Sequence, residues 1–313
     1  MNITVTGDCR ETMRAWATAG VRAQMCVTSP PYFGLRNYGH EGQLGLEQTP
    51  EQYIAAMVEV FRCVRDVLAD DGTLWLNIGD SYARAGGWSD NHGLDGVPRG
   101  ESGRAISGIS ANGGKSQKLA DGCKTKDLIG IPWMLAFALR ADGWFLRQDI
   151  IWHKPNPMPE SVRDRCTKAH EYVFLLSKSE RYFYDHEAIQ EPADPANFRE
   201  SRGIRRTPDG QADQSGFRYG RKYPMRNKRD VWSIAVKPYK GAHFATFPPA
   251  LIEPCILAGS RVNDIVLDPF MGSGTTAAVA LQHGRQYLGC ELNPAYRPLQ
   301  DARIATSVGP LFA

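Results

Sequence analysis

A glycine turn at residues 268–276 is a strong candidate for chemistry, because it joins a short apolar run to a helical pattern. Gly272 and Gly274 stand just before that pattern. Glycines let a ligand approach the backbone closely, and free amides at a helix N-terminus attract anionic groups. Glu291 follows Asp268 by 23 positions (291 minus 268), where a carboxylate can accept hydrogen bonds from both hydroxyls of a ribose. The pattern favours a nucleoside-cofactor site.

Two better-known glycine motifs do not fit this turn. A dinucleotide fold normally shows G-x-G-x-x-G, and a P-loop carries a lysine after its second glycine. Here Gly274 is followed by Thr275 and Thr276. A G-x-G alone is often a structural turn, but the preceding strand and the acidic residues favour a ligand site.

A second candidate is Ser29-Pro30-Pro31-Tyr32, which follows the apolar run 25–28. Two prolines fix the backbone and remove two N–H donors, so the carbonyl groups are rigidly aimed. We expect Tyr32 to be an exposed aromatic side chain beside these acceptors. Such a pair can hold a flat group that carries an amine, although a Pro-Pro-Tyr triplet alone is more often only a loop.

Together the two segments resemble the signature motifs of the amino-group DNA methyltransferases, which use S-adenosylmethionine. The resemblance covers nearly the whole chain. Gly7-Asp8-Cys9 resembles the family element before the catalytic strand, and residues 243–248 resemble the element that supports the methionine end of the cofactor. The catalytic motif precedes the glycine motif, an order similar to that of the circularly permuted beta class.

The resemblance implies an α/β fold, a Rossmann-like methyltransferase sheet with helices on both faces. It also implies catalytic roles for Ser29, Pro30, Pro31 and Tyr32 toward a base flipped out of double-stranded DNA. Hydrogen bonds from the base amine to the Ser29 hydroxyl and the Pro30 carbonyl would favour a pyramidal nitrogen that attacks the sulfonium methyl, with no metal. The implied cofactor-binding residues are Asp8, Thr28, His243, Phe247, Asp268, Pro269, Phe270, Gly272, Gly274, Thr275 and Glu291.

Residues 196–229 hold ten basic residues against three acidic ones, a local balance of +7, with aromatic residues between them. Such a segment is either a solvated loop or a surface that meets phosphates and bases. The resemblance implies a target-recognition region at 187–235, between a catalytic part at 1–186 and a cofactor-binding part at 236–313. The candidate DNA-binding residues are Arg199, Arg202, Arg205, Arg206, Arg218, Arg221, Lys222, Arg226, Lys228 and Arg229.

The elements that must position these motifs alternate between strands and helices, which is typical of a mainly parallel α/β sheet. Residues 83–122 contain ten glycines and are expected to form a long mobile loop, either near the active-site mouth or as a dispensable insertion. The sequence predicts strands at 25–28, 73–78, 145–152, 172–177, 264–267 and 287–290, and helices at 51–69, 126–140, 249–258 and 275–283, with a turn at 70–72.

Composition restricts the class of protein. The chain has 313 residues, 42% of them hydrophobic, which suits one large domain or two modest ones. No stretch approaches the roughly 18 uncharged apolar residues of a membrane span. Seven cysteines without a C-x-x-C pair argue against a disulfide framework or a zinc site, and favour a reducing cytoplasm. With the family resemblance, we expect a bacterial or phage-encoded cytoplasmic protein. Beta-class relatives are often homodimers, and a cognate restriction endonuclease is a further candidate partner; the sequence leaves both open.

Other functions fit the sequence less well than methylation of an amino group in DNA. Pro254-Cys255 resembles the nucleophile of cytosine C5 methyltransferases, but it stands in an apolar helical run, so we interpret Cys255 as core. A non-catalytic DNA-binding protein, and methylation of RNA or of a protein glutamine, are less consistent with the intact motifs and the basic segment. Within the family Ser-Pro-Pro-Tyr is mostly found with cytosine N4 as the target, so we predict cytosine N4, with adenine N6 as the alternative.

Overall fold

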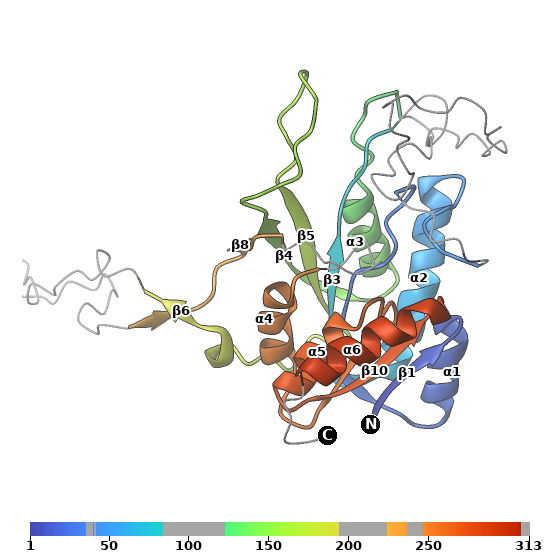
Figure 1. The fold of residues 1–313 in the computed structure, drawn as a ribbon, viewed down its shortest axis with the longest axis vertical. Coiled ribbons are helices and arrows are strands. Elements are labelled where there is room, and N and C mark those ends of the chain that lie inside the picture. Colours follow the sequence, from blue (N-terminus) through green and yellow to red (C-terminus); the bar gives the residue numbers. More distant parts are fainter. Residues whose placement is uncertain (36–39, 41, 84–122, 194–223, 237–246, 308–313) are drawn as a thin grey trace, which may run out of the picture.

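The computed structural model describes residues 1–35, 40, 42–83, 123–193, 224–236 and 247–307 (Figure 1). Its centre is an eight-stranded sheet in the order β1-β10-β9-β2-β3-β5-β4-β8. These strands are β1 (Asn2–Thr6), β2 (Ala23–Thr28), β3 (Leu68–Ile78), β4 (Phe145–His153), β5 (His170–Ser177), β8 (Val231–Ser233), β9 (Ile265–Asp268) and β10 (Gln286–Glu291).

Helices cover both faces of the sheet (Figure 1). On one face Met13, Phe61 and Leu135 bring three helices into one buried cluster, and on the other Leu251 and Val279 bring in two more. The predicted α/β architecture is therefore confirmed. The helices are α1 (Cys9–Thr18), α2 (Pro50–Val67), α3 (Ile131–Ala141), α4 (Pro249–Gly259), α5 (Thr275–Gln282) and α6 (Arg297–Ser307).

Strand directions bring the two sequence motifs to one edge of the sheet. β1, β10, β9, β2 and β3 run parallel, so their carboxyl ends meet there. β1 and β10, the first and last strands in the sequence, are neighbours in the sheet, with Val5 opposite Cys290. The two ends of the chain therefore belong to one continuous sheet, although the motif order is permuted. β5 is antiparallel to β3, so it begins at the edge where β3 ends. Ligands in open α/β sheets bind outside the carboxyl ends of the strands.

Three predicted boundaries are wrong. The helix expected at 126–140 begins only at Ile131, because Gly130 adopts a left-handed conformation (φ 87°) and the Asp80 carboxylate accepts hydrogen bonds from the amides of Gly130 and Ile131. The helix expected to reach residue 69 ends at Val67, and residues 70–72, expected as a turn, lie inside β3.

Among the strands of the main sheet and the α-helices, four elements were not predicted: β1, α1, α6 and β8. β1 is an edge strand whose residues are mostly exposed or partly exposed, so the apolar run that marks buried strands is missing from its sequence. Within the span expected for target recognition, β8 pairs with β4 and extends the main sheet.

Short elements complete the chain, and some predictions fall outside them. η2 (Glu187–Ile189) leads to a two-stranded ribbon of β6 (Glu191–Pro192) and β7 (Met225–Arg226), while η4 (Pro294–Tyr296) precedes α6. The predicted glycine-rich loop at 83–122 lies, beyond residue 83, outside the described residues, as does most of the basic segment. No helix in the described ranges is long and apolar enough to cross a membrane.

Candidate active site

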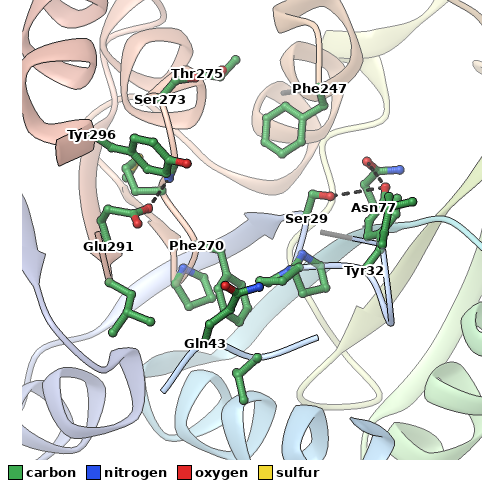
Figure 2. A pocket seen from close by; sticks show the side chains of 18 of the residues that line it. Ser29, Tyr32, Gln43, Asn77, Phe247, Phe270, Ser273, Thr275, Glu291 and Tyr296 are labelled. Atoms are coloured by element: carbon green, nitrogen blue, oxygen red, sulfur yellow. Dashed lines mark hydrogen bonds between the residues drawn. The ribbon is translucent and has the colours of Figure 1, made fainter. Parts of the chain in front are cut away.

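A cavity of about 630 Å³ lies at the carboxyl edge of the sheet and joins the two motifs (Figure 2). Ser29 and Tyr32 contribute to one part of its wall, and Gly272 and Glu291 to another. Segments that are some 240 residues apart thus share one space, which is within the usual size of a ligand pocket.

The glycine turn follows β9 and ends where α5 begins. Gly272 (φ 52°) and Gly274 (φ 82°) both have left-handed backbones, which glycine adopts without steric cost. A Cβ atom at Gly274 would lie 3.1 Å from the Gln300 Cα, so α6 packs directly on this turn. The sequence therefore needs glycine here for both conformation and space.

Asp268 lies behind the turn, where it is buried with 1% of its surface exposed. Its carboxylate accepts hydrogen bonds from the Thr28 and Thr276 hydroxyls, each at 2.6 Å, and from the Phe270 amide at 3.0 Å. Burial raises the pKa of Asp268, and these three donors oppose that shift. Thr28, Asp268 and Gly274 do not line the cavity, so they hold the turn in place.

Glu291, at the end of β10, faces the cavity. One carboxylate oxygen accepts the Gly272 amide and the other accepts the Asn293 amide, both at 2.8 Å. A carboxylate has about four acceptor sites, so Glu291 retains acceptor capacity for a ligand. Burial raises the pKa of Glu291. The arrangement suits a ligand with two adjacent hydroxyls.

The two prolines of Ser-Pro-Pro-Tyr present their carbonyl groups differently. The Pro31 carbonyl accepts a hydrogen bond of 3.0 Å from the hydroxyl of Tyr53, which is buried in α2. Pro30 lines the cavity, and its carbonyl accepts no hydrogen bond from the described residues. Tyr53 thus fixes the loop from behind and leaves the Pro30 carbonyl for a ligand.

Tyr32 is half-buried, so the expectation of an exposed side chain is wrong. Its hydroxyl donates to Glu171 Oε2 at 2.8 Å. The same hydroxyl lies 3.4 Å from Ser29 Oγ (Figure 2). Gly79 packs against the ring, since an added Cβ would lie only 2.7 Å from Tyr32 Cε2. Burial raises the pKa of Tyr32, so the phenol keeps its proton and the ring keeps its orientation.

The polar residues of the cavity wall that the sequence analysis missed include Asn77 near the end of β3, Lys154 just after β4, and Glu171 near the start of β5. Asn77 donates to Glu171 Oε2 at 3.3 Å, and the Lys154 ammonium donates to Glu171 Oε1. Each is a polar residue at the end of an apolar strand. That signal was present, but only the sheet pairing shows that the three strand ends meet.

The other predicted site residues line the cavity, lie near the ribbon of β6 and β7, or fall outside the described residues. Asp8 caps α1 and pairs with Arg10 at 2.6 Å; the hydrogen bond from Arg10 lowers the pKa of Asp8. Arg226 and Arg229 both pair with Glu191 beside the ribbon. Asp8, Phe247, Pro269, Phe270 and Thr275 line the cavity. Lys228 lies over the ring of Trp232. Outside the described residues lie His243, Arg199, Arg202, Arg205, Arg206, Arg218, Arg221 and Lys222.

Comparison with known proteins identifies the family. A family model described as DNA methylase matches residues 23–300. The Type II methyltransferase M.SmaI of Serratia marcescens is 47% identical over 305 residues, which cover 96% of this chain and 89% of that protein. This chain belongs to the amino DNA methyltransferases. M.Cfr9I of Citrobacter freundii is 46% identical over 290 residues, 93% of this chain and 83% of that protein. The motif order places the methyltransferase in the beta class.

Solved structures agree with this methyltransferase in fold. The PvuII DNA methyltransferase, named as cytosine-N4-specific, superposes with a TM-score of 0.61 at 18% identity, covering 96% of this chain and 86% of that one. TTHA0409 of Thermus thermophilus, a putative DNA modification methylase complexed with S-adenosylmethionine, gives 0.59 at 24% identity, covering 99% and 96%. Both likenesses support the predicted Rossmann-like sheet.

Cys255 does not belong to the chemistry of this methyltransferase. It lies in α4 with 1% of its surface exposed, and burial raises the pKa of its thiol well above the usual range. A buried, protonated thiol is a poor nucleophile. The interpretation of Cys255 as core is confirmed, and ring-carbon attack through this residue is excluded.

The cavity residues fit a nucleoside cofactor. The Ser273 hydroxyl is buried at the cavity wall and has no hydrogen-bond partner among the described residues. Glu291 retains acceptor capacity beside it, and Phe270 and Tyr296 add flat side chains to the same wall (Figure 2). A ligand with ribose hydroxyls and a flat base satisfies these groups. Within the described ranges, no cluster of three or more metal-ligating side chains occurs.

Proposed function

We propose that this protein is a site-specific Type II DNA methyltransferase that transfers a methyl group from S-adenosylmethionine to N4 of a flipped cytosine. The observation that carries the proposal is the single cavity, which joins Gly272 and Glu291 to Ser29, Pro30 and Tyr32. It gives a nucleoside cofactor and an amine-bearing base access to one another. The family supplies the reaction class.

The cofactor side is assigned as follows. The Glu291 carboxylate would accept hydrogen bonds from the ribose hydroxyls, and Ser273 would bind a further polar group. Bound S-adenosylmethionine supplies an electrophilic methyl group on a sulfonium sulfur. Asp8, Phe247, Pro269, Phe270 and Thr275 are the remaining candidate contacts on the wall. We assign Thr28, Asp268 and Gly274 to holding the glycine turn.

The base side must make a poor nucleophile reactive. The lone pair of an exocyclic amine is delocalised into its ring, which weakens attack. Ser29 Oγ and the Pro30 carbonyl can accept hydrogen bonds from the two amine N–H groups and favour a pyramidal nitrogen. The Tyr32 ring, fixed through its hydroxyl, offers a surface on which the flipped base stacks, offsetting part of the few kcal/mol of unstacking.

The choice of cytosine N4 over adenine N6 rests on Ser29. Ser-Pro-Pro-Tyr is mostly associated with cytosine N4 in this family, whereas an acidic or amide residue in place of the serine is typical for adenine. A hydroxyl can donate to a ring nitrogen or accept from an amine, whereas an ionised aspartate can only accept. Adenine N6 is the second candidate, because its amine also adjoins a ring nitrogen.

Incubation with labelled S-adenosylmethionine and genomic DNA, followed by nucleoside mass spectrometry and methylation-aware sequencing, tests this function. We expect N4-methylcytosine at one sequence, and none from Ser29→Ala or Tyr32→Ala. N6-methyladenine alone would overturn the target base but not the enzyme class. DNA binding with no methyl transfer would instead support a non-catalytic DNA-binding protein.

The proposed partners are double-stranded DNA and a restriction endonuclease of the same site. The Type II names of the relatives support the second partner. DNA methylated by this protein should then resist cleavage at its site. Light scattering of the purified protein tests the homodimer that beta-class relatives often form.

A further inference from the structure

The carboxylate of Glu171 lies in the cavity wall and accepts hydrogen bonds from three donors. Oε2 accepts the Tyr32 hydroxyl at 2.8 Å and Asn77 Nδ2 at 3.3 Å, while Oε1 accepts the Lys154 ammonium. The Glu171 and Lys154 side chains are only 15% and 19% exposed. An ion pair shielded to this degree adds little net stability, because desolvation offsets the attraction. Stability alone therefore does not explain two charges at this wall.

The Lys154 ammonium, in contrast, has N–H groups that bond to no described residue. An ammonium group carries three N–H bonds. One is directed to Glu171, and Nζ lies 4.3 Å from the centre of the Trp152 ring; the ammonium makes no other hydrogen bond to the residues that the structure describes. Both Lys154 and Trp152 line the cavity. A cation with free donors at a cavity wall suits a ligand with an acceptor atom.

The donors and acceptors follow one another along this wall. Ser29 Oγ lies 3.4 Å from the Tyr32 hydroxyl, which lies 2.8 Å from Glu171, and Lys154 binds the other oxygen of the same carboxylate. Along one edge cytosine carries the amine, a ring nitrogen and the O2 acceptor, so an acceptor such as Ser29 Oγ at one end and a cationic donor such as Lys154 at the other complement the two ends of that edge. Adenine has a C–H group in place of O2.

We propose that Lys154 donates a hydrogen bond to O2 of the flipped cytosine and is a specificity-determining residue. Glu171 is a positioning residue that holds both Lys154 and Tyr32. The inference rests on the proposed function, since it requires a cytosine in the cavity. It predicts that the enzyme contacts both ends of one edge of the cytosine. Ser29 contacts the amine, and Lys154 contacts O2.

The test removes the donor without leaving an unpaired charge. Lys154→Met alone would strand the Glu171 carboxylate, so it is combined with Glu171→Gln, whose amide oxygen still accepts from Tyr32. For cytosine methylation by this double variant, kcat/KM should fall roughly 10- to 100-fold, the range for one charged hydrogen bond. Melting temperature and calorimetric affinity for S-adenosylmethionine should remain those of the wild type.

A matched control is Lys178→Met. The Lys178 side chain is 20% exposed and pairs with Asp70 at 3.3 Å, but Lys178 does not line the cavity. This variant should methylate DNA at the wild-type rate. An effect as large as that of the double variant would mean that losing any shielded lysine impairs the enzyme, which would overturn the assignment.

A substrate analogue tests the contact itself. A 2-aminopyridine C-nucleoside at the target position keeps the amine and ring nitrogen of cytosine but lacks O2. The wild type should lose activity on this analogue relative to cytosine, whereas the double variant should lose several-fold less. Equal losses in both enzymes, or wild-type activity of the double variant on cytosine, would overturn the inference. Failure of the wild type to methylate cytosine at all would instead overturn the proposed function beneath it.

Discussion

Two buried carboxylates near the glycine turn have different tasks because only one of them faces the cavity. Asp268 accepts from two hydroxyls and an amide of the protein and does not reach the cavity. Glu291 accepts backbone amides, among them those of Gly272 and Asn293, and faces the cavity. At this scale, access to the cavity separates a binding residue from a supporting residue.

Glu291→Gln should weaken cofactor binding about tenfold to a hundredfold, because a charged acceptor of roughly 1.5 to 3 kcal/mol is lost. The effect should also depend on pH. Burial raises the pKa of Glu291 above its ordinary 4.5, so the carboxylate takes up a proton sooner as the pH falls from neutral. Wild-type affinity, measured by calorimetry, should fall in that window. An identical fall in Glu291→Gln would assign the pH dependence to another group.

Thr276→Val should lower the free energy of unfolding by about 1.5 to 3 kcal/mol, because it removes a donor from buried Asp268. Since burial raises the pKa of Asp268, ionisation costs stability above that pKa, and this variant enlarges the cost. The loss, followed by urea denaturation, should shrink as the pH falls through the raised pKa and the carboxyl takes a proton.

Thr306→Val is the control for that measurement, because the Thr306 hydroxyl is exposed and bonds only within its own helix, to the Ala302 carbonyl at 2.8 Å. It should change stability by less than about 0.5 kcal/mol. Equal losses in the two variants would mean that the Asp268 contact contributes no more than a surface hydroxyl.

At the scale of elements, the antiparallel strand β5 completes the catalytic edge. Because β5 runs opposite to β3, it begins beside the end of β3, with Tyr172 opposite Ile78. Glu171 therefore reaches Asn77 and the Tyr32 loop after β2. A parallel strand in this place would have put its carboxyl end, not its start, at this edge. The site thus depends on strand direction.

Gly79→Ala, just after β3, should displace the Tyr32 ring, because the new Cβ would lie 2.7 Å from Tyr32 Cε2. We expect the rate of methylation to fall by about tenfold to a hundredfold with the fold intact, since small misplacements of a catalytic surface have effects of that order. Single-turnover methylation measures the change. Calorimetric affinity for S-adenosylmethionine should remain that of the wild type in Gly79→Ala; an equally large loss of cofactor affinity would argue against the Tyr32 ring as its target.

At the scale of the whole molecule, net positive charge is concentrated in one segment of the sequence. The chain carries +3 and residues 196–229 carry +7, so the remainder sums to −4 (3 minus 7). The ribbon of β6 and β7 that leads into this segment lies to one side of the sheet (Figure 1). We therefore expect affinity for DNA phosphates to come from residues 196–229 and not from the remainder of the chain, which is net negative.

Excision of residues 194–223 tests that expectation. The Ala193 amide donates to the Pro224 carbonyl at 2.9 Å, so the two ends are adjacent and a short Asn-Gly turn can join them. The variant should fold and bind cofactor but lose DNA affinity, and its plot of log K against log salt should flatten by about 0.9 per phosphate contact removed. If it methylates the same sites at the wild-type rate, the recognition assignment is wrong.

By itself, the sequence determined the fold class, the family and the two motifs, because each motif is a local pattern whose chemistry follows from neighbouring residues. Asp268, Gly272, Gly274 and Glu291 could be found from a strand, a turn and a spacing. The sequence could not separate supporting from binding residues. Asp268 and Glu291 are both acidic residues at the end of a strand, and only the structure shows which of them faces the cavity.

Only the tertiary structure decided the contacts between strand ends. Asn77, Lys154 and Glu171 come from three strands, and nothing local to any of them indicates that they share a hydrogen-bond network with Tyr32. In the same way Asp80 sets the start of α3 from 50 residues away. Periodicity reports burial and local backbone conformation, whereas these contacts depend on strand order, direction and register, which arise only when the whole sheet assembles.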